Sequence, residues 1–167
     1  TATTEIYTLS LHDALPISWA RARLEGWSLA ALVAFQAFRL PLELLMHQAH
    51  REGVMPGQMT FTGRNLDIVT GLLAIPLAYR LARGHRDTAL VWIWNALGLG
   101  LLINVVVVAV LSMPGPMRLF VNDPPNLWVA TFPFIWLPTV LVPLALAGHI
   151  LIARKLLTKG PGLSSST

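Results

Sequence analysis

Four long apolar blocks, separated by short polar segments, dominate this sequence. They cover about residues 27–47, 66–82, 89–113 and 127–156. A helix needs about 20 apolar residues to cross the hydrocarbon core of a bilayer. The charged residues make up only 12% of the chain, against about 25% in a typical soluble domain. We therefore expect an all-α integral membrane protein whose single domain, residues 19–156, is a four-helix transmembrane bundle.

Prolines interrupt three of the four blocks. Pro41 lies in the first block, Pro76 in the second, and Pro133, Pro138 and Pro143 in the fourth. A proline inside a helix removes a backbone hydrogen bond and crowds the preceding turn, so it bends the helix. The sequence therefore predicts proline-kinked helices.

The basic residues are distributed unevenly around the blocks. The N-terminal flank, the second loop and the C-terminal flank hold Arg21, Arg23, Arg80, Arg83, Arg86, Arg154, Lys155 and Lys159. The first and third loops hold Arg51, Arg64 and Arg118. Because cytoplasmic flanks are enriched in lysine and arginine, both termini of a multi-pass protein should be cytoplasmic. We expect residues 157–167 to form a disordered tail.

Composition also limits the partners. No cysteine is present, which excludes disulfides and thiolate metal sites. The net charge of +4 comes from residues near the block ends, a position that suits lipid headgroups. No basic patch with interleaved aromatic residues points to a nucleic acid. The expected partner is the lipid bilayer, with a homodimer through the third block, where Ala96 and Gly100 form a small-x-x-x-small pair.

A polar stripe marks the first block. At ~100° per residue, Gln36, Arg39, Glu43, His47 and His50 fall within roughly 80° on one side of a helix. An isolated charge inside a membrane costs at least ~2.5–3.5 kcal/mol. This face should therefore point into the bundle.

The first interpretation of the stripe is structural. Arg39 and Glu43 are four residues apart and can pair along the helix. Gln36 can extend the network towards Asn95 or Asn104 of the third block. In this interpretation an intramembrane polar network holds the bundle together, and its members are Gln36, Arg39, Glu43, Asn95 and Asn104.

The second interpretation is a metal site. Glu43, His47 and His50 offer a carboxylate and two imidazoles at i, i+4 and i+7, and Asp67 can add a ligand from the start of the second block. Such a set suits zinc or non-haem iron. Asp67 is equally placed to interact with the dipole of its own helix. Without that metal, the sequence implies no cofactor.

The third interpretation is transport. A single membrane-embedded carboxylate in the first of four spans resembles the plan of small multidrug-resistance exporters. That resemblance implies that Glu43 would bind a proton and a cationic substrate alternately, in a dimer.

No phosphate-cradling glycine loop, serine elbow or zinc-protease helix is found in the sequence. This absence favours a protein that is not an enzyme, without deciding the point.

Two further resemblances concern whole segments. Residues 1–18, TATTEIYTLSLHDALPIS, resemble a translated sequencing adapter of the kind found in metagenomic assemblies, and such residues would not belong to the natural protein. The stretches FRLPLELLMH, MTFTGRNLDIVTG, NDPPN and PFIWLPTVLVPLAL are similar to those of an uncharacterised family of small four-span bacterial membrane proteins. That resemblance implies a bacterial inner (cytoplasmic) membrane location and no specific activity.

Overall fold

The computed structural model describes residues 26–158, and every regular element in this range is a helix. The all-α prediction is thus confirmed for the described residues. The 1–18 segment and most of the 157–167 tail lie outside them. The elements are α2 (Leu29–Phe35), η1 (Gln36–Phe38), α3 (Arg39–Arg51), η2 (Gly57–Met59), α4 (Ile68–Ala82), α5 (Thr88–Leu111), η3 (Trp128–Ala130), η4 (Leu137–Leu141) and α6 (Val142–Thr158).

Three of the described helices are long and apolar enough to cross a membrane. They are Leu29–Arg51, which joins α2, η1 and α3, then Thr88–Leu111, and Leu137–Thr158, which joins η4 and α6. The apolar helix α4 has 15 residues, or about 22 Å at 1.5 Å per residue. By length and composition, the chain is therefore a helical, membrane-associated protein.

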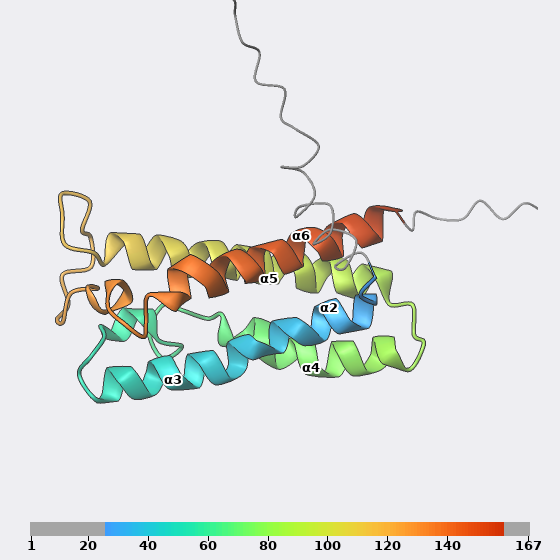
Figure 1. Cartoon of the computed structure of the whole chain (residues 1–167), viewed down its shortest axis with the longest axis horizontal. Coiled ribbons are helices and arrows are strands. Elements are labelled where there is room, and N and C mark those ends of the chain that lie inside the picture. The colour runs from blue at the N-terminus through green and yellow to red at the C-terminus, as the bar shows by residue number, and fades with distance from the viewer. Residues whose placement is uncertain (1–25, 159–167) are drawn as a thin grey trace, which may run out of the picture.

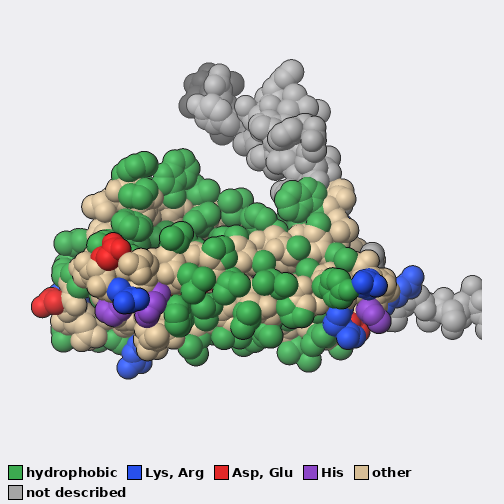
Figure 2. All heavy atoms as spheres, turned by 90° about the horizontal axis from the view of Figure 1, so that it is seen from below, with side chains coloured by type: hydrophobic (Ala, Val, Ile, Leu, Met, Phe, Trp, Pro, Cys, Tyr) green, Lys and Arg blue, Asp and Glu red, His purple; other side chains and the backbone are tan. Residues whose placement is uncertain are grey.

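The helices run side by side along the long axis of the molecule (Figure 1). The start of α2, the end of α6 and the turn at residues 83–87 lie at one end of this bundle. The loops at residues 52–67 and 112–136 lie at the other end, which we call the loop end. Figure 2 shows a largely hydrophobic middle on one face, with charged side chains gathered at its two ends. This distribution is typical of a protein that spans a bilayer.

The last long helix begins later than the sequence suggested. Residues 127–136 form the short η3 and a series of turns, and continuous helix begins only at Leu137. Pro138 occupies the first turn of that helix, where a missing backbone N–H costs nothing. The first turn, η4, is a π-helix. In the first span the 3-10 turn η1 directly precedes the turn that contains Pro41; proline-induced kinking stays a prediction.

Two apolar clusters fill the bundle. One contains Leu32, Leu77, Val91 and Ile152, from α2, α4, α5 and α6. The other lies towards the loop end and joins α3 and α5 to the two loops through Met46, Met55, Met59, Val108 and Trp128. Since Met55 and Met59 are buried, the loop at residues 52–67 folds back into the bundle. Along the first span, Gln36, Arg39 and Glu43 lie between Val33 of the first cluster and Met46 of the second.

Glycines set the closest helix contacts. A Cβ atom on Gly71 would lie 2.6 Å from the backbone nitrogen of Leu40, and one on Gly98 would lie 2.6 Å from Cε1 of His149. These glycines let α4 approach the first span and α5 approach α6. Gly100, by contrast, faces open space. The homodimer through Ala96 and Gly100 stays a prediction.

Candidate functional site

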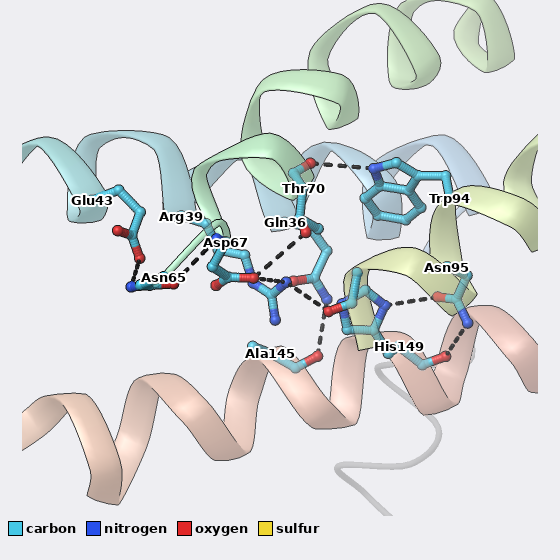
Figure 3. A network of polar contacts seen from close by, with 11 residues as sticks. Gln36, Arg39, Glu43, Asn65, Asp67, Thr70, Trp94, Asn95, Ala145 and His149 are labelled. Atoms are coloured by element: carbon cyan, nitrogen blue, oxygen red, sulfur yellow. Dashed lines mark hydrogen bonds and ion pairs between the residues drawn. The ribbon is translucent and has the colours of Figure 1, made fainter. Parts of the chain in front are cut away.

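The centre of the candidate site is a buried ion pair between the first span and the start of α4 (Figure 3). Nη1 of Arg39 lies 2.9 Å from Oδ1 of Asp67, and both side chains are almost fully buried. The same Nη1 donates to the carbonyl oxygen of Gly98 at 3.3 Å. Arg39 therefore ties the first span to both α4 and α5. The expected pairing of Arg39 with Glu43 is not observed. Asp67 engages only Nη1 of the guanidinium, and Nε and Nη2 of Arg39 are buried without a hydrogen-bond partner among the described residues.

Glu43 has a different partner. Its Oε1 accepts a hydrogen bond of 2.7 Å from Nδ2 of Asn65, and Figure 3 shows the two side chains pointing toward one another. Glu43 forms no ion pair within residues 26–158. It is nevertheless only 2% exposed, and its Oε2 is buried without a hydrogen-bond partner in the described part of the chain.

Asn65 is the link between these two groups, and it comes from the loop that folds back into the bundle. Its Nδ2 also donates to the carbonyl of Met59 at 3.0 Å. Its Oδ1 accepts from the backbone N–H of Asp67 at 3.1 Å. Asn65 is fully buried. The loop therefore places one side chain that touches Glu43 and orients the residue that holds Arg39.

A second polar group lies further along the bundle. Gln36 donates from Nε2 to the carbonyl of Ala145 at 3.0 Å, which connects the first span to α6. Asn95 and His149 form a double contact: Nδ2 of Asn95 donates to the His149 carbonyl at 3.3 Å, and Nδ1 of His149 donates to Oδ1 of Asn95 at 2.8 Å. Figure 3 shows this group beside the Arg39 pair. These contacts join α5 to α6 and α6 to the first span.

Asn104 lies apart from both groups. Its Nδ2 donates to the backbone carbonyl of Arg64 at 2.7 Å, in an exposed position. Asn95 and Asn104 are nine residues apart, so they lie on nearly opposite faces of α5. Of the two asparagines proposed for the network, only Asn95 is buried with the other polar residues.

The four residues of the predicted metal site do not come together. His50 donates from Nδ1 to the carbonyl of Met55 at 3.0 Å, and His47 lies against the ring of Phe61, with 4.7 Å between ring centroids. Asp67 is held by Arg39. Within residues 26–158 no group of three or more histidine or acidic side chains is placed to hold a metal ion.

A cavity of about 370 Å³ lies beside Glu43. Its walls come from α3, α5, residues 126–130, η4 and the start of α6, and most of its lining is aliphatic or aromatic. Among its charged lining residues are Arg39, Glu43 and Asp67. This volume falls in the range of about 300–1,000 Å³ that is usual for small-molecule sites, which are also mostly apolar with a few polar groups.

Part of the cavity wall is also the outer surface of the bundle. Val106, Val110 and Ile135 line the cavity and are 39%, 41% and 39% exposed. In a membrane these side chains would face lipid. The cavity thus lies next to the apolar outer surface of the bundle.

The charges around the cavity do not balance when all three groups are ionised. Arg39 and Asp67 neutralise each other at 2.9 Å. Glu43 then adds one negative charge, which vanishes when its carboxylate takes up a proton. An unpaired charge in an apolar site is strongly unfavourable. A proton on Glu43, or a cation beside it, would remove this excess negative charge.

One family model matches most of the chain. A family model described as Domain of unknown function (DUF8737) matches residues 6–157. The chain belongs to the DUF8737 family. The match covers all the described helices apart from the last residue of α6, and it begins inside the 1–18 segment, whose adapter origin stays a prediction. No curated protein and no solved structure matches the chain.

Several residues of this candidate site were not predicted from the sequence. Asn65 contacts Glu43 only because the loop at residues 52–67 folds back into the bundle. His149 interrupts the apolar run ALAGHILIA, and that isolated polar residue was the available signal. Asn126 and Trp128, which also line the cavity, carried no pattern that separated them from ordinary loop residues.

Proposed function

We propose that this chain is a four-span protein of the bacterial inner membrane, with both termini cytoplasmic, and that it is a small proton-coupled transporter in which Glu43 exchanges a proton for a lipophilic cation. The fourth span in this proposal is α4. It is shorter than the three long helices, and the loop at residues 52–67, which is partly buried in the bundle, precedes it. The start of α2, the end of α6 and the arginine-rich turn at residues 83–87 share one end of the bundle (Figure 1), which supports this orientation.

The observation that carries the proposal is the state of Glu43. It is a buried carboxylate, it lines an apolar cavity, and its Oε2 is free of hydrogen bonds within the described residues. The guanidinium of Arg39 forms its ion pair with Asp67 through Nη1 and forms none with Glu43. An ion pair between Arg39 and Glu43 would compete with a cationic substrate for the Glu43 carboxylate. No such ion pair forms within the described residues. A cation with an apolar body would satisfy both the charge and the lining.

The rest of the polar network supports a structural role. The contacts of Gln36, Arg39 and Asn95 each join two or more helices. Buried hydrogen bonds between membrane helices stabilise a bundle by about 0.6 kcal/mol each on average. We therefore assign Gln36, Arg39 and Asn95 to the framework and Glu43 to ligand and proton binding. This division requires no enzymatic chemistry.

The experiment uses the full chain in proteoliposomes that contain a pH-sensitive dye. Tetraphenylphosphonium is added outside, and proton movement is followed together with uptake of the cation. We expect proton release coupled to cation binding in the parent and its loss in Glu43→Gln, which keeps a hydrogen-bonding side chain beside Asn65. The matched control is Glu52→Gln, because Glu52 ends the same helical span but is exposed and bonds to Gln48.

Three results would count against the proposal. The first is a parent protein that neither binds the cation nor moves protons. The second is a Glu43→Gln variant that behaves like the parent. The third is an equal loss in Glu52→Gln, which would show that the effect does not come from the buried carboxylate.

A further inference from the structure

The cavity contains a second polar position, formed by Asn126 and Trp128 towards the loop end. Both residues line the cavity, and they are 0% and 5% exposed. Oδ1 of Asn126 and Nε1 of Trp128 are buried without a hydrogen-bond partner in the described part of the chain. The two atoms therefore do not satisfy each other. A buried donor and a buried acceptor left unpaired are unfavourable, so such atoms call for an explanation.

Asn126 cannot easily turn away from the cavity. Its Nδ2 donates to the carbonyl of Ala109 at 2.8 Å, and its backbone N–H donates to the carbonyl of Ser112 at 3.1 Å. Both acceptors belong to the C-terminal end of α5, which has carbonyl groups without partners in the helix. With the amide nitrogen fixed in this way, Oδ1 is left as a fixed acceptor.

Trp128 is fixed by packing. Its ring meets the ring of Phe134 edge to face, with centroids 4.9 Å apart and an interplanar angle of 78°. It also belongs to the apolar cluster that contains Met46 and Val108. A buried tryptophan usually finds an acceptor for its N–H. Here the ring is held by its neighbours, and the N–H is left as a fixed donor.

An unpaired donor and an unpaired acceptor, both neutral and both on residues that line one cavity, suit a neutral group that can accept and donate. A hydroxyl donates its hydrogen to Asn126 and accepts from Trp128, and a primary amide does the same with separate atoms. We propose that the Asn126–Trp128 position binds a hydroxyl or a primary amide of the ligand. This inference rests on the proposed function and narrows it: besides its cationic group and apolar body, the ligand carries a neutral hydrogen-bonding group.

The test compares matched probes on the full chain in lipid nanodiscs. The probes are alkyltrimethylammonium ions of increasing chain length and their counterparts with a terminal hydroxyl, each measured by competition with tetraphenylphosphonium. In the parent protein, at the chain length that spans the cavity, the hydroxyl probe should bind more tightly than the plain one. In Trp128→Phe, which keeps the aromatic packing but lacks the N–H, the hydroxyl probe should bind about tenfold more weakly, as expected for one lost hydrogen bond. The plain probe should be unaffected.

The matched control is Trp136→Phe, since Trp136 is 55% exposed and does not line the cavity. Binding of the plain probe to Trp128→Phe also shows that the variant is folded. Equal binding of both probes by the parent at every length, or an equal change for both in Trp128→Phe, would overturn the inference; water bound at this position would give the first of these results. If neither probe bound to the parent, the proposed function itself would fail, and the two failures are therefore distinguishable.

Discussion

Replacing Arg39 by methionine should destabilise the bundle severely, through Asp67. The pair is almost fully buried, with 2.9 Å between Nη1 and Oδ1. Removing one partner of a buried ion pair leaves an uncompensated charge and typically costs about 3–5 kcal/mol. The carbonyl of Gly98 loses a donor as well. We expect Arg39→Met to lose about 3–5 kcal/mol of unfolding free energy.

The partner of Arg39 can be identified by rescue. Asp67→Asn removes the charge left behind in Arg39→Met, so the double variant should recover most of the lost stability. Glu43→Gln removes the other nearby carboxylate. Because Glu43 is bonded to Asn65 instead, the Arg39→Met/Glu43→Gln variant should stay within about 1 kcal/mol of Arg39→Met alone.

The assay is reversible unfolding in mixed dodecylmaltoside and dodecylsulfate micelles, followed by the fluorescence of the six tryptophans and by circular dichroism. The reasoning would be refuted by a loss below about 1 kcal/mol in Arg39→Met, which is too small for a buried pair. Rescue by Glu43→Gln with none by Asp67→Asn would refute the observed pairing and restore the pairing along the helix.

Three further predictions concern other parts of the chain. Gly98→Ala should lower the unfolding free energy by about 1–3 kcal/mol, since its Cβ would meet His149 at 2.6 Å. Gly100 faces open space, so Gly100→Ala should be neutral or stabilise the helix by up to about 1 kcal/mol. Equal effects of the two substitutions in the same micelle assay would contradict this contrast. Gly100→Leu should abolish cross-linking between copies in nanodiscs while leaving the fold intact, and unchanged cross-linking would exclude the dimer face. Arg80 donates to Asp87 at 2.7 Å and holds the pKa of Asp87 below its ordinary value of about 3.9. The contact should therefore stabilise the turn at pH values above that ordinary value, and this stabilisation should be lost as the pH falls through the lowered pKa. Carbon NMR titration of Asp87 should show the lowered midpoint, and Arg80→Gln should raise it.

Much of the helical plan could be predicted from the sequence, because hydrophobic length and the 3.6-residue period are local properties. The first and third blocks became Leu29–Arg51 and Thr88–Leu111 with shifts of a few residues. The fourth block was predicted to begin at about residue 127, but its helix begins only at Leu137. The apolar run continues through residues 127–136, whereas Pro133 and Pro138 favour a later helix start. Hydrophobicity alone could not locate that start.

The position of the polar residues on the first helix was also a local property. Gln36, Arg39 and Glu43 share one face by spacing alone, and all three are buried. What they contact was not local. Gly71 and Gly98 allow α4 and α5 close enough to deliver Asp67 and the Gly98 carbonyl to Arg39, and a returning loop delivers Asn65 to Glu43.

The sequence by itself thus determined a helical, membrane-associated chain with a charged face on its first span. The tertiary structure decided that Arg39 pairs with Asp67 and that Glu43, beside an apolar cavity, forms no ion pair among the described residues. The physical reason is that spacing fixes the direction of a side chain around its own helix. The group that it meets depends on how closely the other segments approach, and those distances exist only in the folded bundle.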